Sequence, residues 1–92
     1  MADTGLLQEL VNKTVKLGDR LHLNRDQSFK SLDQSILPQI TSDSYGHSSA
    51  FRSHAMSMLL DVTKLMFNST RWEDRYGAIN AAVLLVKFFY PE

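Results

Sequence analysis

An all-α fold of about four helices is predicted for this chain of 92 residues. Apolar residues recur every three to four positions in four stretches, which is the period of one helix face. No two stretches show the alternation typical of paired strands. The two halves are separated by residues 41–49, which are mostly small and polar and therefore favour a linker. A chain of this length forms a single domain, residues 1–92, with only a modest core.

Residues 1–40 are expected to form two N-terminal capping helices. The first ends near Gly18, because glycine commonly follows a helix. The second opens near Asn24, which has capping-box spacing to Gln27. Pro38 is expected to end or kink it, because proline lacks the amide donor. The apolar positions of these helices are Leu6, Leu7, Leu10, Val11, Val15, Leu17, Phe29, Leu32, Ile36 and Leu37.

Residues 50–90 are predicted to form an antiparallel hairpin of two helices. Thr70 is the expected N-cap of the second helix, and Glu73 three residues later completes a capping box. The loop before Thr70 is short, which places the two helices antiparallel. The apolar stripe of the first helix consists of Phe51, Ala55, Met58, Val62 and Leu65, and it is flanked by Leu59 and Met66.

The last helix carries two apolar stripes. The first is expected to pack on the preceding helix, with Trp72 substantially buried; its members are Trp72, Tyr76, Ile79, Val83, Val86 and Tyr90. One helix shields only one side, so the second stripe is exposed unless residues 6–37 cover it. Because an exposed apolar surface marks a protein interface, this stripe is the predicted partner-binding surface. Its residues are Ala78, Ala82, Leu85 and Phe89.

The run Asn-Ser-Thr-Arg-Trp-Glu-Asp-Arg at residues 68–75 resembles the start of the second helix of a HEAT repeat. It is followed at helical spacing by small and aliphatic residues: Ala78, Ala81, Ala82 and Val86. The resemblance covers residues 50–90 and implies a hairpin from a helical-repeat scaffold. It also implies that Arg75 forms an ion pair with the adjacent repeat; the alternative is an ordinary surface ion pair.

Composition argues against several other classes of function. There is no cysteine, and the three histidines lack companion ligands at metal spacing, so no metal or cofactor is expected. Phosphate-binding loops and nucleophile motifs are also missing. Residues 81–89 are too short an apolar run to span a membrane. The first residues do not resemble a secretory signal, so a cytoplasmic or nuclear protein is expected.

The predicted function is therefore non-enzymatic: a protein-interaction or scaffold module. It is expected to be the N-terminal part of a larger helical-repeat protein or a small adaptor. One alternative is a nucleic-acid-associated bundle, although the balanced charge disfavours nucleic acid as a partner. Its basic stretch would be Lys13, Lys16, Arg20, Arg25 and Lys30. A second alternative is a homodimer, in which the last helix of each copy forms the dimer core.

Overall fold

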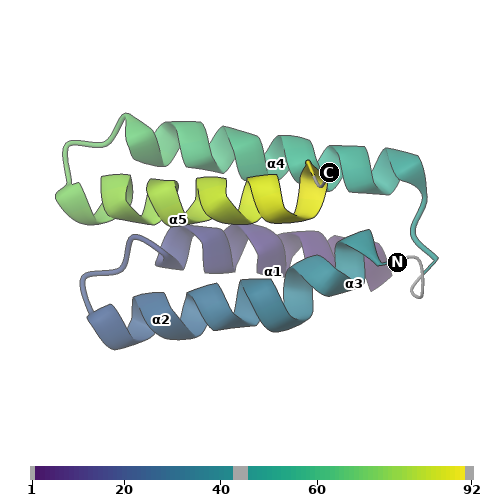
Figure 1. The fold of residues 1–92 in the computed structure, drawn as a ribbon, viewed down its shortest axis with the longest axis horizontal. Helices are drawn as coiled ribbons and strands as arrows, with labels where there is room; N and C mark the ends of the chain where they lie inside the picture. The colour runs from purple at the N-terminus through teal and green to yellow at the C-terminus, as the bar shows by residue number, and fades with distance from the viewer. Residues whose placement is uncertain (1, 43–45, 91–92) are drawn as a thin grey trace.

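The computed structural model describes residues 2–42 and 46–90, and its helices confirm the all-α prediction (Figure 1). The helices are α1 (Ala2–Lys16), α2 (His22–Ser31), α3 (Leu37–Thr41), α4 (Ser49–Phe67) and α5 (Trp72–Phe89). A π-helical turn, η1 (Leu32–Ile36), joins α2 to α3 without a loop. The described residues therefore form four helical rods and contain no strand.

The second rod continues past Pro38, where the sequence predicted an end or a kink. In η1 the Leu37 N–H donates to the Leu32 carbonyl, five residues back, which is the widened turn of a π-helix. Such a turn relieves the crowding that proline imposes on an ordinary helix. The rod also starts earlier than predicted, at His22. Asn24 is not its cap but donates to the Asp19 carboxylate at 3.3 Å.

The predicted linker, residues 41–49, lies only partly within the described residues. Ser42 leaves the helix with extended backbone, and residues 43–45 lie outside the described residues. Gly46 has a φ of 68°, a left-handed conformation that favours glycine. Helix α4 then begins at Ser49, because the Ser48 side chain accepts a hydrogen bond from the Phe51 N–H at 3.1 Å.

Helices α4 and α5 lie antiparallel, and α1 packs against α2, α4 and α5 (Figure 1). The core forms where these rods meet, and every helical rod contributes to it. Its fully enclosed large side chains are Leu10, Leu17, Leu32, Leu37, Ile40, Leu59 and Leu84. Two buried hydroxyls are satisfied locally, since Thr14 donates to the Leu10 carbonyl and Thr63 to the Leu59 carbonyl.

Helix α5 approaches α1 through its smallest residues. A Cβ atom at Gly77 would lie 2.5 Å from the Leu17 carbonyl oxygen and 2.8 Å from the Gly18 amide nitrogen. Only glycine permits this distance between the two backbones. Ala78 and Ala81 continue the same face and have no exposed surface. The small-residue side of α5 is therefore its interior side.

This orientation exchanges the two stripes predicted for the last helix. Ala78 and Leu85 are buried within the chain, and Ala82 and Phe89 are half-buried, so this stripe belongs to the core and its margin. The prediction that these four residues form an open binding surface is therefore wrong, although the half-buried Ala82 also borders the exposed side of α5. The prediction that Trp72 is buried is also wrong, because 57% of its surface is exposed.

The buried face of α4 is shifted from the predicted stripe, of which only Ala55 is fully buried, towards Leu59 and Met66, which flank that stripe in the sequence. Its buried residues are Ala55, Leu59, Thr63 and Met66. Leu65, placed in the predicted stripe, is 73% exposed. Because the buried face of α4 is shifted, its exposed apolar residues also differ from those expected, and together with those of α5 they form the apolar part of the surface.

Candidate interaction surface

The outward side of α5 is a continuous row of large apolar residues, here called the α5 face. Its members are 46% to 59% exposed: Trp72, Tyr76, Ile79, Val83, Val86 and Tyr90. They are spaced alternately four and three residues apart along the helix. Such spacing keeps all of them on one side of the helix. The α5 face is therefore a stripe rather than a scatter of exposed side chains.

A hollow of about 450 Å³ lies in the middle of the α5 face. It is lined by Phe67 at the end of α4 and by Ile79, Ala82, Val83 and Val86 of α5. Its walls present carbon atoms almost exclusively. With Phe67 included, the exposed fractions correspond to on the order of 700 Å² of surface. Monomeric proteins seldom expose more than a few hundred Å² of apolar surface in one patch.

The N-terminal end of the α5 face combines two aromatic rings with a cation. Trp72 and Tyr76 meet edge to face, with ring centroids 6.4 Å apart. The Arg25 guanidinium, from α2, lies 5.5 Å from the Trp72 ring and 5.6 Å from the Tyr76 ring. Its position is fixed by a 2.8 Å hydrogen bond from Nη1 to the Asp19 carbonyl. Both rings keep about half of their surface open despite this cation–π contact.

Charged residues border the α5 face at opposite ends. Glu73 lies beside its N-terminal end and Lys87 beside its C-terminal end. Lys87 donates from Nζ to the Asp33 carboxylate of η1 at 2.6 Å. Arg75 is exposed and donates from Nη1 to the Ser69 carbonyl at 3.0 Å. An apolar centre with charged margins is the usual plan of a protein interface.

The predicted capping box is wrong, and a different arrangement starts α5. The N-cap is Arg71, and no side chain accepts a cap hydrogen bond there. Thr70 is exposed. Glu73 does not reach back to cap the helix, and its Oε1 lies 3.9 Å from Nε of Arg71. Ser69 takes the structural role, because its hydroxyl accepts from the Arg71 N–H at 3.1 Å and donates to Asp74 at 2.7 Å. The sequence favoured Thr70 because Glu73 follows it at capping-box spacing, whereas Ser69, one residue earlier, has Trp72 at that spacing.

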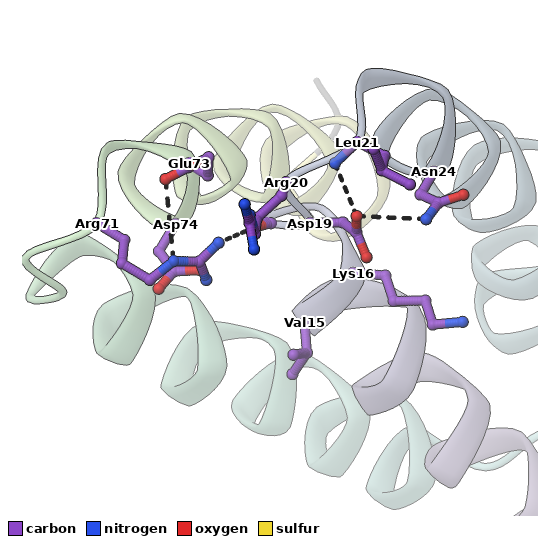
Figure 2. Close-up of a pocket in the computed structure, with 10 residues that line it drawn as sticks. Val15, Lys16, Asp19, Arg20, Leu21, Asn24, Arg71, Glu73 and Asp74 are labelled. Atoms are coloured by element: carbon purple, nitrogen blue, oxygen red, sulfur yellow. Dashed lines mark hydrogen bonds and ion pairs between the residues drawn. The ribbon is translucent and has the colours of Figure 1, made fainter.

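A polar pocket of about 890 Å³ lies where the α1–α2 loop meets the start of α5 (Figure 2). Arg71 crosses it, donating to the Gly18 carbonyl at 3.2 Å and to Asp74 at 3.0 Å. Asp19 accepts from the Leu21 N–H at 2.8 Å, and this hydrogen bond holds the pKa of Asp19 below its usual value.

The bonds across the polar pocket join the two loops at that end of the molecule. Arg71, Asp74 and Asp19 all have partners within the chain, as Figure 2 shows. The polar residues of this pocket therefore have a structural role, because they connect the two halves of the domain. The exposed apolar groups that point to a function lie on the α5 face instead.

Three other functional candidates are a basic stretch, a metal site and a membrane-spanning helix. Arg25, one of the five members of the predicted basic stretch, is occupied by its contacts with Trp72 and Tyr76. Across residues 2–42 and 46–90 the structure contains no group of three or more His, Cys, Asp or Glu placed to hold a metal ion. None of the described helices has the length and apolar character needed to cross a membrane.

Comparison with known proteins adds no relative. No protein-family model matches the chain, and no match was found among curated proteins or solved structures. The similarity of residues 50–90 to a HEAT repeat therefore rests on the sequence pattern itself. The α4–α5 hairpin is compatible with that pattern, because two antiparallel helices form such a repeat.

Proposed function

We propose that this chain is a non-enzymatic protein-interaction module that binds its partner through the α5 face. One observation carries the proposal: six large apolar side chains stand outward at regular spacing on a helix whose small residues face the core. Covering them would remove apolar surface from water, which is the main driving force of association. The module acts in the cytoplasm or nucleus, as a small adaptor or within a larger scaffold.

The residue types on the α5 face support a binding role. Trp, Tyr and Arg are the residues that most often dominate binding energy at interfaces. Here Trp72, Tyr76 and Arg25 form one cluster at the end of the face. Contacts within the chain already position the rings and the guanidinium. A preorganised cluster loses less side-chain freedom on binding than mobile side chains do.

The helical-repeat hypothesis is a specific form of this proposal. In a repeat array, the hairpin that follows would cover an apolar side of α4 and α5. Arg75 would then reach an acidic group of that hairpin, as the HEAT resemblance implies. Its exposure and its single 3.0 Å bond to Ser69 are consistent with this role.

The proposal is tested by site-specific photocrosslinking in cells. A photoreactive amino acid replaces Val83 on the α5 face or, as a matched control, Leu65 on α4, and crosslinked proteins are identified by mass spectrometry. Both positions are more than half exposed, so neither replacement disturbs the core. We expect a protein that is crosslinked from position 83 and not from position 65.

The captured protein is then purified and its binding measured directly. It should bind the wild type and the Leu65→Glu variant with equal affinity, and the Ile79→Glu/Val83→Glu variant at least ~100-fold more weakly, because two central apolar contacts are lost. Equal labelling from both positions, or binding that is insensitive to the double substitution, would contradict the proposal.

A further inference from the structure

We infer that the α5 face binds a second copy of this chain, with the two α5 helices antiparallel about a two-fold axis between Ile79 and Val83. The inference rests on the proposed function and specifies its partner. Three properties of the α5 face lead to it: its heptad spacing, the dipole of its helix, and its area.

The spacing of the α5 face is that of a coiled-coil contact. Alternating steps of four and three residues, sustained from Trp72 to Tyr90, match the a and d positions of successive heptads. The central hollow is bounded within α5 by Ile79, Ala82, Val83 and Val86, which stand at positions i, i+3, i+4 and i+7. Four residues at this spacing form the hole that receives a knob from a facing helix.

An antiparallel copy fills this hole symmetrically. Aligning Ile79 with Val83 of the second copy also aligns Tyr76 with its Val86 and Trp72 with its Tyr90. All six positions of the α5 face then have a partner. The Ile79 side chain of each copy enters the hole of the other. Because the same patch serves both sides, the contact closes as a dimer and does not propagate.

The helix dipoles favour the antiparallel direction. Glu73 and Lys87 lie on the same flank of the α5 face, at opposite ends. In the antiparallel arrangement each Glu73 lies on the side of the Lys87 of the other copy, but the Glu73 side chain is only 19% exposed and already lies beside Arg71, so these two charges contribute little to the attraction. A parallel arrangement would bring each residue next to its own copy and align the two helix dipoles unfavourably. Lys87 retains Asp33 as its intramolecular partner in either case.

The area of the α5 face, when all of it is covered, is comparable with that of a standard dimer interface. The exposed surface of the α5 face with Phe67, on the order of 700 Å², approaches the ~800 Å² that each partner buries in a standard interface. Trp72, Tyr76 and Tyr90 supply much of it. Arg25 adds a charged margin beside Trp72 and Tyr76.

Sedimentation equilibrium over a dilution series tests the association. We expect the wild type and Leu65→Glu to be dimers that dissociate on dilution, and Ile79→Glu/Val83→Glu to be a monomer with unchanged helical circular dichroism. Trp72 is the only tryptophan, so its emission should shift to the red as the wild-type dimer dissociates. A wild type that is monomeric throughout, or a dimer that tolerates the double substitution, would overturn the inference.

Cysteine crosslinking tests the direction of the helices, since the natural chain has no cysteine. Ala82→Cys lies close to its own copy near the axis and should form a disulfide-linked dimer. The two Tyr90 positions are about 27 Å apart in the antiparallel arrangement, so Tyr90→Cys alone should not crosslink. A mixture of the Trp72→Cys and Tyr90→Cys variants should form a disulfide-linked dimer, because these two positions face each other in the antiparallel arrangement. Efficient crosslinking of Tyr90→Cys alone would refute the antiparallel geometry, even if the double glutamate variant proved unfolded.

The outcomes separate this inference from the proposed function. If photocrosslinking from position 83 captures a different protein and the wild type sediments as a monomer, the interaction module stands and self-association is wrong. If position 83 captures only this chain, both hold. If no partner depends on the α5 face in either experiment, both are wrong.

Discussion

Replacing Gly77 with Ala tests the interior packing of α5 most directly. An added Cβ would lie 2.5 Å from the Leu17 carbonyl oxygen, 2.6 Å from the Leu17 carbonyl carbon and 2.8 Å from the Gly18 amide nitrogen. All three are backbone atoms, so no side-chain rotation relieves the contact. Either α5 must move away from α1 or the end of α1 must unwind. Both changes would disturb the packing of Ala78 and Ala81 beside it.

The magnitude follows from two opposing effects. Overpacking of a tight contact destabilises by about 1 to 3 kcal/mol, and the contact with rigid backbone points to the upper end. Alanine offsets about 1 kcal/mol of this through its better helix propensity. We therefore expect a net loss of roughly 2 kcal/mol in the free energy of unfolding. For a domain of this size, the loss corresponds to a melting temperature lower by roughly 10 °C.

The assay is urea denaturation followed by circular dichroism, at one fixed protein concentration so that association does not vary between samples. Gly5→Ala is the matched control, because outside the neighbouring backbone of its own helix no atom lies within 4 Å of the added Cβ, and Gly5 is also helical. It should stabilise the protein by up to ~1 kcal/mol. If Gly77→Ala were as stable as the wild type, the close approach of α5 to Leu17 would be wrong.

Two further predictions concern the loops. Ser69→Ala should destabilise by about 1 kcal/mol, because the Ser69 hydroxyl bonds both Arg71 N–H and Asp74, whereas Thr70→Ala should stay within about 0.5 kcal/mol in the same denaturation assay. A larger destabilisation by Thr70→Ala than by Ser69→Ala would support the capping box predicted from the sequence. The Leu21 N–H lowers the folded-state pKa of Asp19. Its stabilising effect is therefore present above the unfolded pKa of about 4 and lost as pH falls through the lower folded value. Asp19→Asn should flatten that acid-side loss in a pH series of melting temperatures, and an unchanged profile would exclude this contribution.

The number and placement of the helices followed from the sequence because they depend on local pattern. Gly18 lies just beyond the end of α1, and the polar residues before Ser49 precede α4, as predicted. Proline was expected to end or kink the second helix, and the pattern could not show that the helix would continue through Pro38 by way of a π turn. A π turn depends on how the rod packs, with Leu32, Ile36 and Leu37 all buried, and proline itself signals only that the ordinary turn is disturbed.

The orientation of α5 could not be predicted from apolar periodicity. Both of its stripes are apolar, so the pattern is satisfied by either rotation of the helix. The deciding signal was residue size: Gly77, Ala78 and Ala81 permit the backbone of α1 to come close, and larger side chains on that side would not. The candidate site was missed for the same reason, because the residues assigned to the core are those exposed at the surface.

Residue size also explains why the α5 face is better suited to a partner than to the domain core. The four helical rods meet at short distances, and the core is filled by aliphatic side chains with alanines where α5 crosses. No room remains in this packing for Trp72 or the two tyrosines of the α5 face, and rotating α5 inward would separate it from α1. Large apolar groups on the outside of such a closely packed helix add little to the stability of the single chain. Their regular spacing fits the contact with another helix, which is the role the antiparallel dimer gives them.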